Sequence, residues 1–489
     1  MSHPLLGKTS AAIGVMLVLL AVPYSSPRLA RLRVAHMPWE PKEEIAAESE
    51  VARTVAAPAP VPTQGETKLQ ASKNEGTVTN SLPETPALAK PSAEDLAKTK
   101  GSIAIEDPSG HAMDAFYTRL FRTKKKEVGA VTRIEHYGDS VITSDYISGT
   151  MRRKMQAEFG DAGHGFILAA KAWDWYFHND VVMGAGEGWT SSKVTGPFNR
   201  DLAYGIGGVS FVGAPGCTSW YGTSKGETYG KKVSRFDVYY METASGGDIE
   251  LKADGKTETF STKSADSKDS KIHSFPVTDG ENKMTLRVVS GAPRLFGVAL
   301  ERDVPGVVYD ALGANGGRGS LLAAMNPDHW KQQFDLRDPA LIVLQYGTNE
   351  SEAGMADRDA YEKTQRVLVD KVKAAAPNAS VLVIAPLDRA QKIDGELKTM
   401  PVIKKLVDAQ RKVAGEAGVA FWNTFEAMGG EGSMALWVKK GLAGSDLTHP
   451  SPQGGEVLGD LLFKALTSGY EAWSQGSRPG PKLPENKTN

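Results

Sequence analysis

The feature that most constrains the fold of this chain is an almost uninterrupted apolar run, Ala340–Tyr346. A strand with one face in water alternates apolar and polar residues, whereas a continuous apolar run is typical of a strand buried on both faces. Such strands occur in parallel sheets whose two faces are covered by helices. The run therefore predicts an α/β domain built on a parallel sheet.

The residues after this run repeat the same alternation of helix and strand. A helical pattern over residues 358–376 precedes an apolar strand, Ser380–Ala385, and a second helical pattern, Val402–Ala417, precedes the strand Val419–Trp422. Repeated strand-helix-strand units produce a parallel sheet, in which strands that are consecutive in the sequence usually lie side by side. Reactive groups are then expected at the carboxyl ends of the strands.

Residues 181–303 have a different character. Glycine is frequent there, helical periodicity is absent, and short alternating runs are separated by Gly, Asp and Ser turns, which predicts an antiparallel β-sandwich. The predicted strands are Phe236–Tyr240, Asp248–Lys252, Lys271–Val277, Met284–Val289 and Leu295–Leu300. The sandwich is thus an insert that divides the α/β domain into residues 106–180 and 304–475.

The two ends of the chain differ from both domains. Residues 1–39 contain an apolar run, Ala11–Val22, which is too short for a comfortable membrane span and suits the core of an export signal. Whether this segment is cleaved or remains as a membrane anchor is left open. Residues 40–105 are rich in Ala, Pro and Glu, and this composition predicts a disordered linker. We also predict that residues 476–489 form a disordered tail.

Charge and cysteine content exclude several classes of function. The formal net charge is −1, so no basic excess indicates a nucleic-acid partner. Cys217 is the single cysteine, which rules out an internal disulfide framework. No Cys/His cluster has zinc spacing, and we predict no metal site.

The first candidate for chemistry is Ser140, in the sequence Gly138-Asp139-Ser140. A β-prone run ends there, and a helical pattern, Tyr146–Phe159, follows. The free N–H groups at the start of a helix stabilise negative charge, so this is a suitable position for a nucleophilic hydroxyl. Gly-Asp-Ser taken alone is equally compatible with an ordinary turn.

Two further polar stretches are expected at the same sheet edge. Gly347-Thr348-Asn349-Glu350 follows the buried strand, and Asp446-Leu447-Thr448-His449 precedes a C-terminal helical pattern, Gln453–Leu466. Ester hydrolysis requires a nucleophile, a base within hydrogen-bond reach and a carboxylate that orients the base. Separately, each stretch has a simpler explanation: Asn349 as a helix cap, Asp446 as a turn residue and His449 as a surface histidine.

Taken in order, these stretches resemble the motifs of the SGNH, or GDSL, hydrolase superfamily. The resemblance implies a three-layer α/β/α fold and ester hydrolysis without a cofactor. It also implies that Ser140 is the nucleophile, that His449 is the general base and that Asp446 orients His449.

The same resemblance implies an oxyanion hole. Its donors would be the Asn349 side chain, the Ser140 N–H and a glycine N–H in the stretch Leu312–Gly317, with Gly316 the first choice and Gly313 the second. These glycines are also compatible with a tight turn. The chain departs from the family pattern at Glu350, where an aspartate is usual.

The β-rich insert and the export signal together resemble bacterial peptidoglycan O-acetylesterases. This implies an O-acetylated glycan of the cell wall as substrate, and a location in the periplasm or cell envelope, with a tether to the inner membrane left open. Alternatives are a lipase or thioesterase, a polysaccharide O-acetyltransferase and a non-catalytic glycan-binding protein.

Several aromatic residues are candidates for stacking on sugars, although packing in the core explains such residues equally well. They are Trp173, Trp175, Tyr176, Trp189, Trp220 and Tyr221. The sequence does not single out any of them as a ligand of the substrate.

Overall fold

The computed structural model describes residues 104–226, 228–352, 354–355 and 357–476. The predicted export segment (residues 1–39) lies outside these ranges, as do nearly all of the predicted linker (40–105) and tail (476–489). Among the described helices, none has the length and apolar character needed to cross a membrane.

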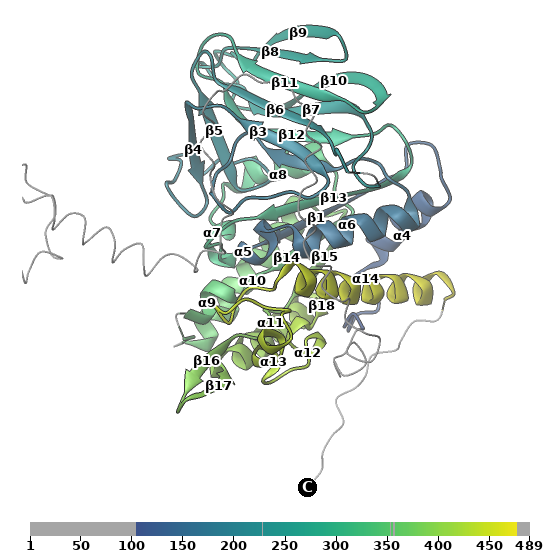
Figure 1. Cartoon of the computed structure of the whole chain (residues 1–489), viewed down its shortest axis with the longest axis vertical. Coiled ribbons are helices and arrows are strands. Elements are labelled where there is room, and N and C mark those ends of the chain that lie inside the picture. Colours follow the sequence, from purple (N-terminus) through teal and green to yellow (C-terminus); the bar gives the residue numbers. More distant parts are fainter. Residues whose placement is uncertain (1–103, 227, 353, 356, 477–489) are drawn as a thin grey trace, which may run out of the picture. The chain divides into compact units, whose positions relative to one another are not determined.

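A five-stranded, fully parallel sheet forms the centre of the α/β domain (Figure 1). Its order is β13 (Gly306–Gly313), β1 (Val131–Gly138), β14 (Leu341–Gln345), β15 (Ser380–Ile384) and β18 (Ala420–Trp422). β1 therefore has β13 on one side and β14 on the other. Gly138, the last residue of β1, lies level with both Gly313 and Gln345.

Helices cover both faces of this sheet. Helices α4 (Asp114–Lys124), α6 (Tyr146–Phe159) and α14 (Pro452–Ser474) pack with the strand residues of one face, such as Leu341 and Val343. Helices α8 (Pro327–Arg337), α10 (Arg358–Ala375) and α11 (Pro401–Ala417) pack with the alternate residues, such as Ile342 and Leu344. The prediction of a three-layer α/β/α domain is confirmed.

The residues between β1 and β13 form two antiparallel sheets, so the predicted inserted β domain is also confirmed. One sheet contains β10 (Ser270–Gly280), β7 (Val233–Met241), β12 (Arg294–Glu301), β5 (Val209–Gly213) and β4 (Trp189–Lys193), and β2 (Gly165–Leu168) pairs with β12. The other contains β3 (Val181–Ala185), β6 (Thr218–Thr223), β11 (Lys283–Val288), β8 (Asp248–Ala253) and β9 (Lys256–Ser261). β2 lies on the α/β side of the boundary predicted at residue 181 but joins a sheet of the insert.

Some elements were not predicted from the sequence. They are β13 and the strands β2 to β6 and β9, the hairpin of β16 (Ala390–Ile393) and β17 (Glu396–Thr399), the helix α8, and the short helices α5 (Ser140–Thr143), α7 (Gly319–Ala323), α9 (Thr348–Glu352), α12 (Thr424–Ala427) and α13 (Ser433–Lys439). β13 combines glycine ends with a central aspartate, Asp310, so its apolar run is interrupted.

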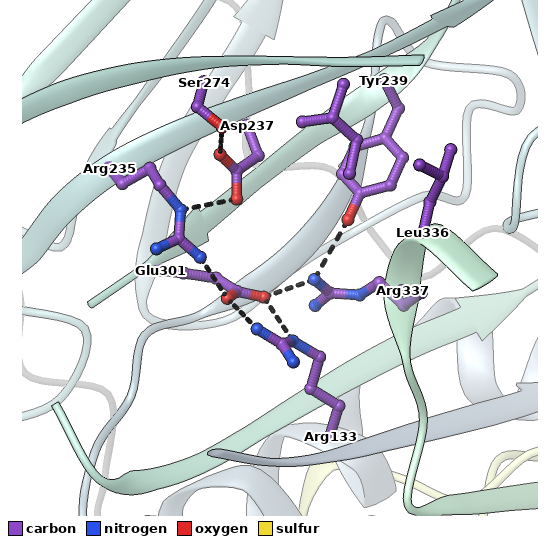
Figure 2. Close-up of a pocket in the computed structure, with 9 residues that line it drawn as sticks. Arg133, Arg235, Asp237, Tyr239, Ser274, Glu301, Leu336 and Arg337 are labelled. Carbon is purple, nitrogen blue, oxygen red and sulfur yellow. Dashed lines mark hydrogen bonds and ion pairs between the residues drawn. The ribbon is translucent and has the colours of Figure 1, made fainter. Parts of the chain in front are cut away.

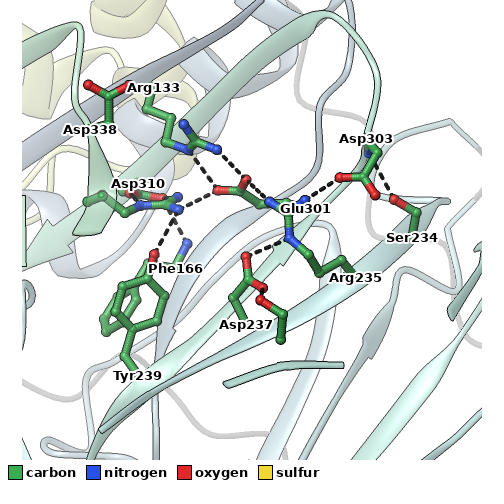
Figure 3. A network of polar contacts seen from close by, with 12 residues as sticks. Arg133, Phe166, Ser234, Arg235, Asp237, Tyr239, Glu301, Asp303, Asp310 and Asp338 are labelled. Atoms are coloured by element: carbon green, nitrogen blue, oxygen red, sulfur yellow. Dashed lines mark hydrogen bonds and ion pairs between the residues drawn. The ribbon is translucent and has the colours of Figure 1, made fainter. Parts of the chain in front are cut away.

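A cluster of charged side chains joins the two domains (Figure 3). Glu301, at the end of β12, accepts hydrogen bonds from Arg133 of β1, Arg235 of β7 and Arg337 of α8. Burial alone would raise the pKa of Glu301, but the arginines outweigh burial and hold this pKa well below its usual range. The carboxylate is therefore ionised and fully paired.

Arg337 connects Glu301 to the edge of the parallel sheet. Its guanidinium also donates two hydrogen bonds, of 2.6 and 2.8 Å, to Asp310 of β13, and Asp310 accepts from the Phe166 N–H of β2 at 2.8 Å. Gly165 precedes Phe166 with φ +100°, and a Cβ there would lie 2.2 Å from Asp310 Oδ1. Only glycine allows β2 to approach β13 this closely.

A cavity of about 280 Å³ adjoins this cluster (Figure 2). Its walls include Arg133, Arg235, Asp237, Tyr239 and Ser274. Arg133 lies near the start of β1, about 17 Å along the strand from its carboxyl end. Because each arginine of the wall already donates to a carboxylate, the cavity offers no unpaired charge to an anion.

We expect Glu301→Gln to destabilise the protein by about 3 kcal/mol, because a buried arginine would lose its carboxylate partner. Urea unfolding at pH 7 measures this loss. The matched control is Asp370→Asn, which breaks the exposed pair of Arg366 and Asp370 on α10 and should cost less than about 1 kcal/mol. Equal losses in the two variants would contradict the structural role of Glu301.

Candidate active site

Ser140 lies at the first position of the short helix α5, separated from the end of β1 only by Asp139. Asp139 caps this helix: its side chain accepts a hydrogen bond from the Val141 N–H at 3.0 Å, and its carbonyl accepts from the Ile142 and Thr143 N–H groups. No described group accepts from the Ser140 N–H, so this donor faces outward from the helix start. The local sequence thus places a hydroxyl and a free N–H together.

The structure brings Ser140 together with His449 and Asp446, as the sequence predicted. The Ser140 Oγ is 2.7 Å from His449 Nε2, and His449 Nδ1 is 2.7 Å from Asp446 Oδ2. The side chains of Asp446 and His449 are each about one-quarter exposed, at 24% and 27%. Hydroxyl, imidazole and carboxylate therefore form one line that is accessible from solvent.

The protonation state of Asp446 determines the direction of these hydrogen bonds. Burial raises the pKa of Asp446, but hydrogen bonds from the His449 ring and from the N–H groups of Thr448 and His449 outweigh burial and lower this pKa overall. An ionised carboxylate only accepts hydrogen bonds, so His449 Nδ1 carries the proton. His449 Nε2 is then the acceptor, and Ser140 donates its hydroxyl proton to it.

The turn from Asp446 to His449 is held in place by a residue that the sequence did not reveal. Arg389 Nε donates to Thr448 Oγ1 at 3.1 Å, and its Nη1 donates both to the Thr348 carbonyl at 2.8 Å and to Ser351 Oγ at 2.6 Å. Arg389 therefore connects the Asp446–His449 turn to helix α9, which carries Asn349. It follows β15 without a recognisable motif, so only the fold identifies it.

The proposed oxyanion donors Asn349 and Gly316 lie just after the two strands that flank β1. Asn349 follows β14, and its Nδ2 donates to the Gly317 carbonyl at 2.8 Å, which leaves a second N–H on the same nitrogen. Gly316 follows β13, is exposed and has φ +72°. Its N–H has no acceptor among the described residues. Each of the two groups therefore retains an N–H without an acceptor among the described residues.

Gly313, the second choice, has a clear structural role. It ends β13, is buried and lies level with Gly138. A Cβ at Gly313 would lie 2.3 Å from the Thr143 nitrogen of α5. Glycine at this position is therefore required for close packing of β13 against the helix that begins at Ser140.

Glu350, the departure from the family pattern, reaches across to the glycine stretch. Its Oε1 accepts from the Gly319 N–H at 3.0 Å, whereas its Oε2 is buried without a hydrogen-bond partner in the described residues. Burial, with a smaller contribution from Asp139, raises the pKa of Glu350 from its ordinary value of 4.5 to about 7. The carboxyl group is thus substantially protonated near neutral pH.

The aromatic candidates fall into different environments. Tyr176 and Tyr221 are buried at 4% and 1% exposure, and Trp173, Trp189 and Trp220 are partly buried. Trp175 is exposed at 36% and lies near the active site, because the Asn315 side chain donates to its carbonyl at 3.3 Å. Only Trp175 among the six combines exposure with this location.

Comparison with known proteins is consistent with this geometry. Residues 277–457 match the GDSL-like lipase/acylhydrolase family. This range contains Gly316, Asn349, Asp446 and His449, whereas Ser140 lies before it, on the other side of most of the β domain. No curated protein matches the sequence.

Among solved structures, a peptidoglycan O-acetylesterase has the same fold, with a TM-score of 0.64 and 21% identity over 76% of this chain and 100% of that chain. A protein from Bacillus subtilis matches with a TM-score of 0.30 and 14% identity over 58% of this chain and 90% of that chain. A family two carbohydrate esterase from Cellvibrio japonicus matches with a TM-score of 0.25 and 14% identity over 60% of this chain and 98% of that chain.

The raised pKa of Glu350 makes stability depend on pH. The unfolded chain releases this proton near pH 4.5 and the folded chain near pH 7, so ionised Glu350 destabilises the folded state as pH rises through this window. We expect Glu350→Gln to be more stable than wild type by up to about 3 kcal/mol at pH 8, and of equal stability at pH 4. Urea unfolding at both pH values measures the difference; a gain that is the same at both would contradict it.

Proposed function

We propose that this chain, a serine esterase with a GDSL-like lipase/acylhydrolase domain, removes O-acetyl groups from a cell-wall glycan and that its substrate is peptidoglycan. The observation that carries the proposal is the line of short hydrogen bonds from Ser140 through His449 to Asp446, 2.7 Å each. A serine hydroxyl that attacks an ester needs an imidazole base within hydrogen-bond reach and a carboxylate that orients this imidazole.

The first half of the reaction transfers the acetyl group to Ser140. The Ser140 Oγ attacks the acetyl carbonyl while His449 Nε2 takes the hydroxyl proton, and Asp446 stabilises the imidazolium that forms. The carbonyl oxygen becomes an oxyanion, which accepts hydrogen bonds from the Ser140 N–H, the Gly316 N–H and the Asn349 side chain. The intermediate then breaks its bond to the sugar oxygen, which leaves with the proton from His449.

The second half releases acetate. A water molecule gives a proton to His449 Nε2 and attacks the acetyl carbon, and the same three donors hold the second oxyanion. When the bond to Ser140 Oγ breaks, the serine recovers its proton from His449, and acetate leaves. Each donor of such a hole contributes about 3 kcal/mol to the stability of the transition state.

The choice of substrate is supported by the architecture as a whole. The solved peptidoglycan O-acetylesterase is covered over its full length by this chain, so both the α/β domain and the β domain belong to the shared fold. The export segment predicted in residues 1–39 agrees with a cell-wall substrate. We propose that the protein acts in the periplasm or cell envelope, either released or tethered to the inner membrane by that segment.

Acetate release from isolated cell wall tests the proposal. We expect the purified protein to release acetate from O-acetylated peptidoglycan but not from the same material after mild alkaline de-O-acetylation, and we expect Ser140→Ala to lower kcat by at least about 10⁴-fold. Activity confined to lipid esters or thioesters, acetyl transfer without release, or binding without release would each overturn the proposal in favour of a different function.

Asp446→Asn tests the orientation of His449. An amide that donates to the ring would favour the wrong tautomer, so we expect kcat to fall by about 10⁴-fold while the melting temperature stays close to that of wild type. Steady-state hydrolysis of p-nitrophenyl acetate, with calorimetry on the same samples, measures both quantities. Retention of more than one-tenth of the wild-type kcat would contradict this role for Asp446.

A further inference from the structure

The segment Trp173–Asn179, which we call the rim loop, runs from the β domain to the active site. It leaves β2, whose partner is β12 of the sandwich, and leads to β3 in the other sheet. Between these strands the loop passes α5 and the glycine stretch after β13. The β domain therefore contributes a segment to the edge of the α/β domain where Ser140 lies.

Two contacts connect the rim loop to the segments that carry Ser140 and Gly316. The Phe177 N–H donates to the Thr143 carbonyl at 3.1 Å, at the end of the helix that begins with Ser140. The Trp175 carbonyl accepts from the Asn315 side chain at 3.3 Å, and Asn315 precedes Gly316. One end of this short stretch thus contacts the nucleophile helix, and the other contacts the proposed oxyanion loop.

The centre of the loop is anchored in the protein. The Tyr176 ring is buried, and its hydroxyl accepts from the Leu168 N–H at 3.0 Å and lies 2.8 Å from His178 Nε2. Asn179 donates its N–H and its side-chain amide to Asp145 at 2.7 Å each. Asp145 is itself paired with the buried Arg152. The loop is therefore held in one conformation before any ligand binds.

The anchoring leaves two aromatic rings in solvent. The exposed fraction is 36% for Trp175 and 41% for Phe177, whereas Tyr176 between them is only 4% exposed. The Trp175 and Phe177 rings lie edge to face with centroids 5.3 Å apart. Large exposed apolar side chains that lie together, rather than singly, indicate a binding surface.

We propose that Trp175 and Phe177 form an aromatic platform that binds the glycan chain next to the acetylated sugar, an inference that rests on the proposed function. Aromatic rings present a flat apolar face with little conformational entropy to lose, which suits the C–H faces of pyranose rings. The platform holds the chain while the acetyl ester enters the space between Ser140, Gly316 and Asn349.

The surroundings of the platform favour a glycan over a lipid chain. Lys171 and Asp174, which are both exposed, precede the two rings in the sequence, and the Lys171 ammonium lies 5.2 Å from the centroid of the Phe177 ring. A long acyl chain needs a continuous apolar groove, whereas a sugar chain presents hydroxyl groups to charged neighbours and apolar faces to the rings. The ammonium can also pair with a carboxylate of an acidic glycan.

Kinetics with two substrates test the platform. We expect Trp175→Ala and Phe177→Ala each to lower kcat/KM for O-acetylated peptidoglycan about tenfold, mainly through KM, and to leave kcat/KM for p-nitrophenyl acetate within twofold of wild type. Trp175→Phe should recover most of the loss. Phe198→Ala is the matched control, because Phe198 is 61% exposed but lies in the loop after β4. We expect this variant to have the wild-type kcat/KM for both substrates.

Two results would overturn the proposal. Unchanged kcat/KM for peptidoglycan in both alanine variants would show that the rings do not bind the substrate. Equal losses on both substrates would show that the rings only support the neighbouring oxyanion loop.

Binding measured without turnover separates this proposal from the proposed function. Soluble fragments of de-O-acetylated peptidoglycan are titrated into Ser140→Ala, and binding is followed by tryptophan fluorescence and calorimetry. We expect the additional change Trp175→Ala to weaken binding about tenfold. If the fragments bind equally with and without Trp175, the platform is wrong even where acetate release is observed; if acetate is not released but Trp175-dependent binding persists, the catalytic proposal alone fails.

Discussion

The arrangement of the active site depends on the pairing of β1 with β13 on one side and β14 on the other. Gly138 lies level with Gly313 and Gln345, so the residues that follow each strand emerge at the same height along one edge. Ser140, Gly316 and Asn349 come from these three neighbouring strands, although the β domain separates the first from the others in sequence. A buried histidine supports the register: the two ring nitrogens of His136 each lie 2.8 Å from a partner, the Tyr309 hydroxyl of β13 and the Gln345 side chain of β14. Burial lowers the pKa of His136 to about 4, so this connection is neutral at physiological pH.

The ionic cluster around Arg337 connects the parallel sheet to the β domain and so fixes the position of one relative to the other. Arg337 pairs with Asp310 on β13 and with Glu301 on β12, and both partners are almost completely buried. β12 in turn pairs with β2, and β2 leads into the rim loop. The same side chains that join the domains therefore determine where Trp175 and Phe177 lie relative to Ser140. A flexible linker between the domains would not achieve this, because the two rings could then move by several ångströms relative to Ser140.

The sequence predicted those parts that depend on local patterns. The helix Tyr146–Phe159 was predicted with its observed ends, and the continuous apolar run correctly indicated β14. Ser140, Asp446 and His449 were recognisable because their motifs are short and ordered along the chain. β13 was missed because Asp310 interrupts its apolar run, and that aspartate is explained only by Arg337, distant in sequence. Arg389 was missed for the same reason, and Trp175 could not be singled out among the six aromatic candidates. Both depend on contacts between segments, such as that of Trp175 with Asn315, and a single sequence has no pattern that records such contacts.

Glu350 illustrates how a departure from a motif can be compensated by the surrounding structure. The carboxyl group follows Asn349, and it reaches the Gly319 N–H beyond the glycine stretch, while Asn349 donates to Gly317. The two segments that we propose as oxyanion donors are therefore joined by two hydrogen bonds. An aspartate at position 350, shorter by one methylene, could keep the bond to the Gly319 N–H only if α9 and α7 moved closer together. Because burial raises the pKa of Glu350 to about 7, much of the population carries no negative charge there at neutral pH. A glutamate can thus support the loop while adding little negative charge near the proposed oxyanion hole.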